Sequence, residues 1–226
     1  MHKKIIVGIT QGDTNGIGYE VLIKSLSDSR INELCTPVVY GSSRLLGFYK
    51  KLCTGTENFN VHITQTATEL HYKMVNLIPC VPEQFAAEPG KMTEEGAQAA
   101  LQALERAVED LRSGKIHVLV TGPFNKQNMK REGFAFPGHT EYLANAFSVK
   151  DPLMLLCSQG MRVGVVTGHV PLALVPSELT KEKILQKIKL MDQTLKKDFT
   201  IRQPRMAVLG LNPHAGDGGL IGTEEQ

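Results

Sequence analysis

Three histidines in separate loops are the residues of this chain best suited to chemistry. His139 precedes a run with helical spacing, whereas His169 and His214 each follow a short apolar run. Neutral imidazole nitrogens suit zinc, cobalt, nickel and manganese-class ions, so loops that converge from separate strand ends could hold one divalent metal. The residues alone leave a second interpretation open, in which the three histidines occupy unrelated polar loops.

The segment around His214 indicates how that ring would be placed. Residues 206–211 form a short apolar run, which predicts a buried strand, and Asn212-Pro213 then turns the chain out of it. We therefore expect His214 at the carboxyl end of a strand, which is the edge where open α/β sheets bind ligands. Asp217 would either orient the His214 ring or belong to a turn of the Gly-Asp-Gly-Gly kind.

Other polar loops could bind anions. Residues 10–18 join a predicted strand to a predicted helix, and their glycines either present backbone N–H groups to an anion or permit a tight turn. The order of these glycines is not the Gly-x-Gly-x-x-Gly of a Rossmann dinucleotide site. Lys126 either holds a phosphate or carboxylate group or covers the sheet edge. Thr140 is expected to cap the helix that begins beside His139.

Strands and helices alternate along the chain. Strands are predicted at residues 5–9, 36–40, 61–63, 74–78, 117–121, 153–156 and 162–167, and helices at residues 19–26, 42–52, 91–112 and 180–197. This alternation indicates a mostly parallel sheet with helices on both faces. Thr93 is expected to cap the helix at 91–112, and the strand at 117–121 is expected to be buried. In the helix at 180–197 an apolar stripe that includes Leu185 packs inward, and the lysines form a solvated face.

The overall composition excludes several classes of protein. A chain of 226 residues with 42% hydrophobic content can form one large or two modest domains. A formal net charge of +2, from 25 basic and 23 acidic residues, is too balanced for a nucleic-acid binder. The N-terminal apolar run is too short for a signal peptide or a membrane span. The four cysteines are scattered without a Cys-x-x-Cys pair, which argues against a disulfide framework or a thiolate zinc site and indicates the cytoplasm.

Five motifs follow one another along the chain. They are Gly12-Asp-x-x-Gly-Ile-Gly18, Thr121-Gly-Pro-x-x-Lys126, Phe136-x-Gly-His-Thr-Glu141, Thr167-x-His-x-Pro-Leu172 and Gly210-Leu-Asn-Pro-His-Ala-Gly-Asp-Gly-Gly219. In order and separation they resemble the motifs of the 4-hydroxythreonine-4-phosphate dehydrogenase (PdxA) family. The resemblance extends from Ile5 to the end of the chain, and five ordered motifs make it specific.

The resemblance implies a reaction and a set of site residues. The reaction is the NAD-dependent, metal-requiring oxidation of 4-phosphooxy-L-threonine at C3, followed by decarboxylation to 3-amino-2-oxopropyl phosphate in pyridoxal phosphate biosynthesis. By motif, His169 and His214 correspond to ligands of a divalent ion (Zn, Co, Mg or Mn), and His139 and Thr140 correspond to substrate contacts. Lys126 is a further candidate for the substrate. The resemblance assigns neither the catalytic base nor the NAD contacts.

The resemblance also implies an architecture. We expect two α/β/α domains of the isocitrate/isopropylmalate dehydrogenase type, at residues 1–148 and 149–226, with an active site at a homodimer interface. The only small-molecule partner expected is the phosphorylated substrate, with no nucleic acid and no membrane. The family continues for on the order of another hundred residues, a size consistent with two full domains. We therefore expect the second domain to be incomplete at its C-terminal side, and the chain alone to hold a metal poorly.

Some positions depart from the family pattern. Thr14 and Asn15 stand where the family usually has proline and alanine, and Gly168 stands where a threonine is common. These departures leave open a sister group that oxidises phosphorylated four-carbon sugar acids, namely 4-phosphothreonate and 4-phosphoerythronate. A non-catalytic binding module is a third hypothesis.

Overall fold

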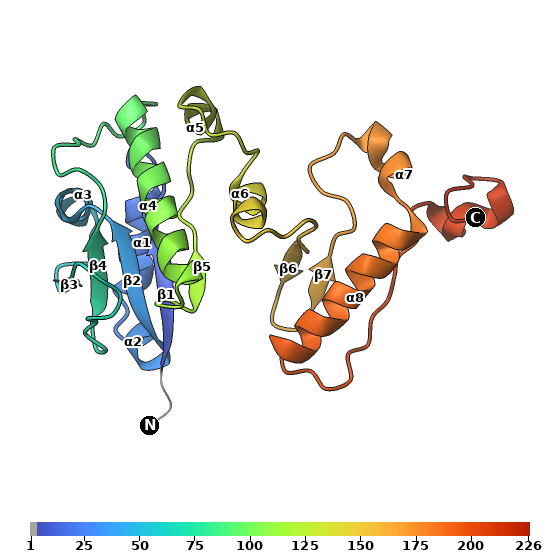
Figure 1. Ribbon diagram of the computed structural model, residues 1–226, viewed down its shortest axis with the longest axis horizontal. Helices are drawn as coiled ribbons and strands as arrows, with labels where there is room; N and C mark the ends of the chain where they lie inside the picture. The colour runs from blue at the N-terminus through green and yellow to red at the C-terminus, as the bar shows by residue number, and fades with distance from the viewer. Residues whose placement is uncertain (1–3) are drawn as a thin grey trace. The chain divides into compact units, whose positions relative to one another are not determined.

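The computed structural model describes residues 4–226. The chain divides into two compact units, Met1–Lys150 and Asp151–Gln226, which Figure 1 colours from blue to yellow and from yellow to red. Within the described residues, no helix has both the length and the apolar character needed to cross a bilayer.

A parallel sheet forms the centre of the first unit. Its strands lie in the order β3-β4-β2-β1-β5, and all four neighbouring pairs run parallel. The strands are β1 (Ile5–Thr10), β2 (Cys35–Gly41), β3 (Val61–Ile63), β4 (Val75–Pro79) and β5 (Val118–Val120). This arrangement confirms the predicted α/β class with a parallel sheet.

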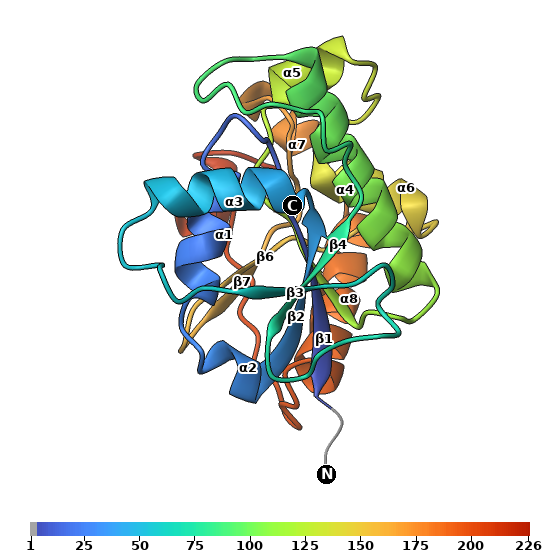
Figure 2. The same ribbon diagram turned by 90° about the vertical axis from the view of Figure 1, so that its left-hand side faces the viewer.

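Helices cover both faces of this sheet. Figure 2 shows α1 (Gly18–Leu26) and α3 (Ser43–Leu52) on one side of the strands and α4 (Glu94–Arg112) on the other. Along β2, Val39 packs with the residues of α1 and α3, whereas Val38 packs on the α4 side. Burial on both faces explains why the strand sequences are almost continuously apolar. The short helix α2 (Ile31–Leu34) precedes β2.

The prediction that the strand at 117–121 is buried was wrong. Strand β5 lies at the edge of the sheet, where Val118 is 45% exposed and Val120 is 52% exposed. In the described part of the chain its only sheet neighbour is β1, so one side of the strand remains open. The start of β5 is nevertheless anchored, because the Ile6 N–H donates to His117 Nδ1 at 2.9 Å.

The second unit contains a hairpin and one long helix. Strands β6 (Leu155–Cys157) and β7 (Arg162–Gly164) pair antiparallel, and both are shorter than the strands predicted at residues 153–156 and 162–167. A 3₁₀ turn, η1 (Leu172–Leu174), and a short helix, α7 (Val175–Glu178), lead to α8 (Lys181–Lys197). This unit therefore shows no parallel sheet within the described residues.

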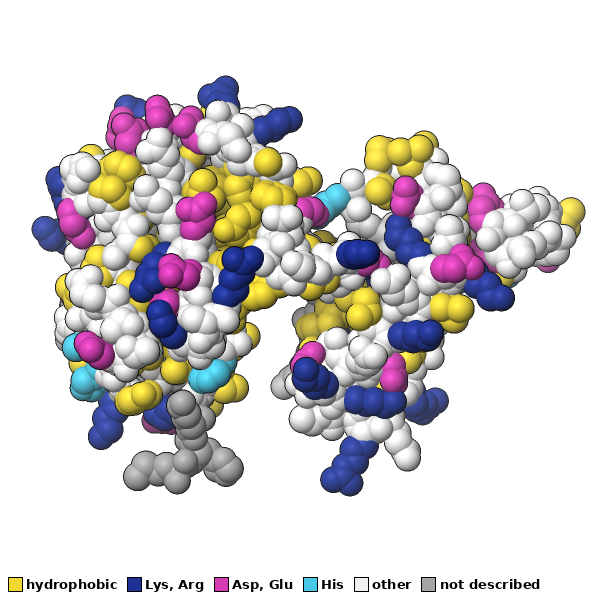
Figure 3. Space-filling view, viewed as in Figure 1, with side chains coloured by type: hydrophobic (Ala, Val, Ile, Leu, Met, Phe, Trp, Pro, Cys, Tyr) yellow, Lys and Arg dark blue, Asp and Glu magenta, His cyan; other side chains and the backbone are white. Residues whose placement is uncertain are grey.

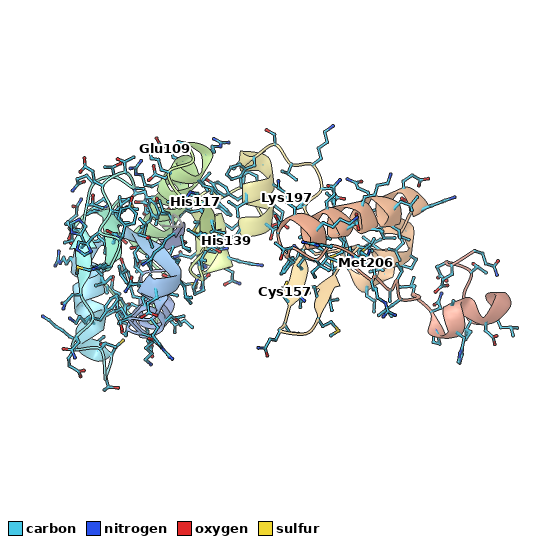
Figure 4. The ribbon with its side chains drawn as sticks, turned by 90° about the horizontal axis from the view of Figure 1, so that it is seen from below. Glu109, His117, His139, Cys157, Lys197 and Met206 are labelled. Atoms are coloured by element: carbon cyan, nitrogen blue, oxygen red, sulfur yellow. The ribbon has the colours of Figure 1, made fainter. Side chains whose placement is uncertain are left out.

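The strand predicted at residues 206–211 is absent. Residues 204–210 have no regular secondary structure, Leu209 is 88% exposed and Val208 is 63% exposed. A groove of about 620 Å³ lies between β7, α8 and this segment. Figure 4 shows Met206 alongside α8 and Cys157 on β6. A local apolar run makes a strand only when another strand pairs with it, and the described residues supply none.

The solvated face predicted for the lysines of α8 holds except at one position. Basic side chains lie over the visible surface of α8 in Figure 3, but Lys187 is buried. Its Nζ lies 2.6 Å from Asp151 Oδ1 and donates to the Pro152 carbonyl at 2.7 Å, so the buried charge is paired. Leu185, expected to face inward, is 46% exposed.

Candidate functional site

Two loops meet at the carboxyl end of the first unit's sheet. The glycine loop (residues 10–18) leaves β1, and residues 121–125 leave β5. The Gly122 N–H donates to the Thr10 carbonyl at 3.1 Å and lies 3.0 Å from Thr10 Oγ1, and the Asp13 N–H donates to the Pro123 carbonyl at 2.8 Å. These bonds join the two loops into one platform at the edge where parallel sheets bind ligands.

Gly12 allows this close approach. Its φ is +70°, and a Cβ at this position would overlap the Pro123 carbonyl oxygen. Only glycine adopts that backbone conformation without steric cost and leaves room for the neighbouring loop.

Lys126 is the first residue of the next helix, α5 (Lys126–Arg131). The Asn125 side chain caps this helix by accepting the Asn128 N–H at 3.0 Å. The Lys126 side chain is exposed, and its Nζ lies 3.8 Å from where a Cβ of Gly138 would be. The structure thus brings Lys126 to the loop that carries His139.

His139 begins α6 (His139–Ala146), and Figure 4 labels it. The helix has Gly138 at its N-cap and no side-chain cap, so the prediction that Thr140 caps it was wrong. A capping residue must have non-helical backbone angles, whereas Thr140 lies in the first turn of the helix.

The His139 ring lies half-buried among aromatic side chains. Its centroid is 3.9 Å from that of Phe124, which itself contacts Phe134 with ring centroids 5.6 Å apart. Burial lowers the pKa of His139, and the positive charge of Lys126 lowers it further. The ring is therefore mainly neutral at pH 7, and a neutral imidazole both donates and accepts a hydrogen bond.

The described structure thus gathers the three predicted substrate residues in the first unit. Lys126 contributes a cation, His139 a neutral imidazole and Thr140 a hydroxyl. The first N–H groups of α6 add the positive end of a helix dipole. This combination suits a phosphate or carboxylate group.

His169 and His214, the two predicted metal ligands, lie in the second unit and are exposed. His169 has φ +57°, and His214 has φ +52° at the start of a left-handed run that extends to Gly218 inside η2 (Pro213–Gly219). Left-handed backbone at non-glycine residues is uncommon and concentrates at functional sites. His214 does not end a strand as expected, because residues 206–211 form none.

The chemistry of the two imidazoles fits a borderline divalent ion, but the ligand set is incomplete. Within the described residues there is no cluster of three His, Cys, Asp or Glu side chains that could hold a metal. Asp217 belongs to the same left-handed turn, and its carbonyl accepts the Leu220 N–H at 3.3 Å. The assignment of His169 and His214 as metal ligands stays a prediction.

Sequence reasoning missed the carboxylates that hold the His214 loop. The Asn212 N–H donates to Glu225 Oε1 at 2.6 Å, and the Asn212 side-chain amide donates to Glu224 Oε2 at 2.7 Å. The Asn212 N–H lowers the pKa of Glu225. No local signal marks such a contact, because these residues lie 12 and 13 positions from Asn212.

Comparison with known families identifies the protein family of this chain. The profile of the family described as "Pyridoxal phosphate biosynthetic protein PdxA" matches residues 33–226. The chain belongs to the PdxA family. The matched residues include four of its five motifs and residues 121–125, which leave β5 at the carboxyl edge of the first sheet.

Individual relatives carry two different names. A 4-hydroxythreonine-4-phosphate dehydrogenase of Bacteroides thetaiotaomicron is 46% identical over 225 residues, which cover 99% of this chain and 61% of that protein. A putative D-threonate 4-phosphate dehydrogenase of Oceanobacillus iheyensis is 34% identical and is matched over 100% of this chain and 68% of its own length. The chain thus spans about three fifths to two thirds of the curated relatives.

A solved structure supports the fold of a PdxA protein. The crystal structure of 4-hydroxythreonine-4-phosphate dehydrogenase from Klebsiella pneumoniae matches with a TM-score of 0.85 and 30% sequence identity. The match covers 98% of this chain and 67% of the Klebsiella chain.

Proposed function

We propose that this chain forms part of an NAD-dependent dehydrogenase that oxidises 4-phosphooxy-L-threonine at C3, with decarboxylation to 3-amino-2-oxopropyl phosphate. The reaction would serve pyridoxal phosphate biosynthesis. Membership of the PdxA family and the name of the Bacteroides relative support the substrate. The observation in the structure that supports the proposal is the position of Lys126, whose Nζ lies 3.8 Å from where a Cβ of Gly138 would be and whose charge acts on His139 at the start of α6.

The residues of the first unit would bind and orient the substrate. Lys126 supplies a positive charge for the phosphate or the carboxylate, and the Thr140 hydroxyl donates a hydrogen bond to the same group. His139 stays neutral beside Phe124, so its ring can donate to a substrate oxygen without adding charge. Charge and position, rather than proton transfer, are the contribution we assign to this group.

A divalent ion belongs to the same proposal. His169 and His214 would be two of its ligands, with zinc, cobalt, magnesium or manganese as the ion. The chemistry that such an ion supplies when bound is a lowered pKa of a coordinated hydroxyl. We further propose a homodimer with the site at its interface, two domains of the isocitrate/isopropylmalate dehydrogenase type, and the cytoplasm as its location.

The proposal is tested by metal-dependent formation of NADH. Protein incubated with NAD and 4-phosphooxy-L-threonine should form NADH when a divalent ion is added, and chelation should abolish the reaction. We expect this chain to react far more slowly than a longer version with the full length of its relatives, because two imidazoles make a weak metal site. Equal rates for the two forms would contradict this.

Variants of the longer version separate the roles of the two groups of residues. His169→Ala and His214→Ala should each lower kcat/KM strongly and weaken metal binding. Lys126→Met should mainly raise KM, because it removes charge that binds the substrate. Loss of activity in these variants would argue against a non-catalytic binding module, whereas full activity of both would contradict the role of the two histidines as metal ligands.

A second candidate function is the oxidation of D-threonate 4-phosphate. The name of the Oceanobacillus relative favours it, and the departures at Thr14, Asn15 and Gly168 leave it open. The two substrates differ in that only 4-phosphooxy-L-threonine carries an amino group. Comparison of kcat/KM for the two compounds decides between them, and the same test can include 4-phosphoerythronate.

A further inference from the structure

Three side chains link separate elements beneath Lys126. Asn15, from the glycine loop, donates through Nδ2 to Thr93 Oγ1 at 2.9 Å. Asn128, from α5, donates through Nδ2 to the Thr93 carbonyl at 2.7 Å. Asn15 and Asn128 are 3% and 4% exposed, so water competes little for these bonds.

Thr93 is the residue where the two contacts meet. Its hydroxyl also caps α4 by accepting the Gly96 N–H at 3.1 Å. Asn15 extends the connection further, because its Oδ1 accepts the Glu88 N–H at 2.8 Å and its carbonyl accepts the Gly90 N–H at 2.8 Å. The glycine loop, the start of α4 and α5 are therefore held by one set of hydrogen bonds.

Helix α5 needs such an anchor. It has only six residues, and helices this short are unstable without tertiary contacts. Its buried residues are Asn128 and Met129, whereas Lys126 is exposed. The position of the Lys126 backbone therefore depends on what Asn128 and Met129 contact.

We propose that Asn15, Thr93 and Asn128 form a positioning network that holds Lys126 beside His139. The inference rests on the proposed function in one respect only, which is that Lys126 and His139 bind the same substrate group. Asn15 departs from the usual family pattern, which has alanine at this position, and an alanine side chain offers no hydrogen bond. Because Asn15 and Asn128 are buried, we assign them no contact with the substrate and expect them to act through Lys126.

The His139 ring offers a readout of this network that needs no substrate. The charge of Lys126 contributes to the lowered pKa of His139, so displacement of Lys126 should raise that pKa. The pKa is measured by NMR titration of the His139 ring in the 226-residue protein. Lys126→Met removes the charge and keeps the length of the side chain. It should therefore give the largest rise in the pKa of His139.

Asn128→Ala and Asn15→Ala should both raise the pKa of His139 toward the Lys126→Met value. The double variant Lys126→Met/Asn128→Ala should show no further rise, because the charge is already gone. Asn58→Ala, at an exposed position of the same unit, is the matched control and should leave the His139 pKa unchanged. Circular dichroism of each variant verifies that it is folded.

Two results would overturn the network. In the first, Lys126→Met raises the pKa of His139, but folded Asn128→Ala and Asn15→Ala proteins keep the wild-type pKa. The other is no change of pKa in Lys126→Met, which would show that Lys126 does not act on His139. If Asn128→Ala fails to fold, Asn15→Ala decides the question alone, because it introduces the residue of the family pattern. Failure of the NADH assay would leave these measurements untouched, so the two proposals can fail separately.

Discussion

At the scale of single residues, His139 shows how surroundings set the behaviour of a side chain. The ring packs on Phe124, and burial together with the nearby Lys126 lowers its pKa. The folded protein therefore favours the neutral form of the imidazole. This preference ties the protonation of one residue to the stability of the protein.

We predict that acid weakens the folded state through His139. In the unfolded chain this residue titrates near its ordinary pKa of about 6.5, whereas in the folded protein it titrates at a lower pH. Between these two pKa values the unfolded state holds more protons, so the free energy of unfolding decreases as the pH falls through that window. Above a pH of about 6.5 this loss of stability is absent, because His139 is then neutral in both the folded and the unfolded state.

Urea unfolding at a series of pH values measures this effect. His139→Gln should flatten the dependence, because the side chain no longer titrates. His71→Gln removes an exposed histidine and should keep the slope of the wild-type protein. Identical slopes for wild-type and His139→Gln protein would show that burial does not disfavour the charged ring.

At the scale of elements, hydrogen bonds between loops determine where the candidate substrate residues lie. The glycine loop after β1 and residues 121–125 after β5 are joined by backbone bonds, and Lys126 follows directly. The approach of the two loops depends on Gly12, whose φ is +70°. A substitution at Gly12 should therefore change the position of Lys126.

We predict that Gly12→Ala destabilises the protein by more than about 1 kcal/mol, because it adds backbone strain and a clash with Pro123. It should also weaken substrate binding by moving Lys126. The matched control is Gly47→Ala, since Gly47 lies inside α3 with no atom within 4 Å of an added Cβ. That control should stabilise the protein by about 0.5–1 kcal/mol. Thermal unfolding of both variants measures the difference, and similar shifts would contradict the role of Gly12.

At the scale of the whole molecule, the two units differ in their cores. The first unit contains three clusters of buried hydrophobic side chains. In the second unit Leu195 is the only buried hydrophobic side chain among the described residues, while Leu172 and Leu209 are more than 80% exposed. Figure 3 shows hydrophobic side chains at the surface over α7. Local stability should therefore be lower in residues 151–226.

Hydrogen exchange tests this difference with two comparable helices. Helices α4 and α8 have 19 and 17 residues, and each is capped by a threonine. We predict that amides of α8 exchange much faster than those of α4, because α4 packs against the sheet and α8 borders an open groove. Exchange measured peptide by peptide with mass spectrometry gives the comparison. Equal protection of the two helices would show that the second unit is more stable than the exposure of its hydrophobic side chains indicates.

Local sequence patterns were sufficient for most of the first unit. The helix at 91–112 was predicted with its Thr93 cap, and the structure has α4 at Glu94–Arg112 capped by Thr93. Strands β1 to β4 likewise lie within about a residue or two of their predicted ranges. Helical periodicity, caps and buried strands are properties of neighbouring residues, so they can be read from a single chain. The motifs that identify the PdxA family are local in the same sense.

Features that depend on contacts between distant residues were decided only by the tertiary structure. The apolar residues 206–211 remain outside any sheet because no strand pairs with them, and strand pairing is a contact between distant segments. For a related reason Gly138, and not Thr140, occupies the N-cap position of α6. The turn before this helix determines where helical backbone angles begin. The contacts that place Lys126 beside His139, through Asn15, Thr93 and Asn128, join residues 35 to 78 positions apart. The sequence by itself therefore determined the elements and the family, whereas contacts between distant residues decided which elements pair and where the candidate site lies.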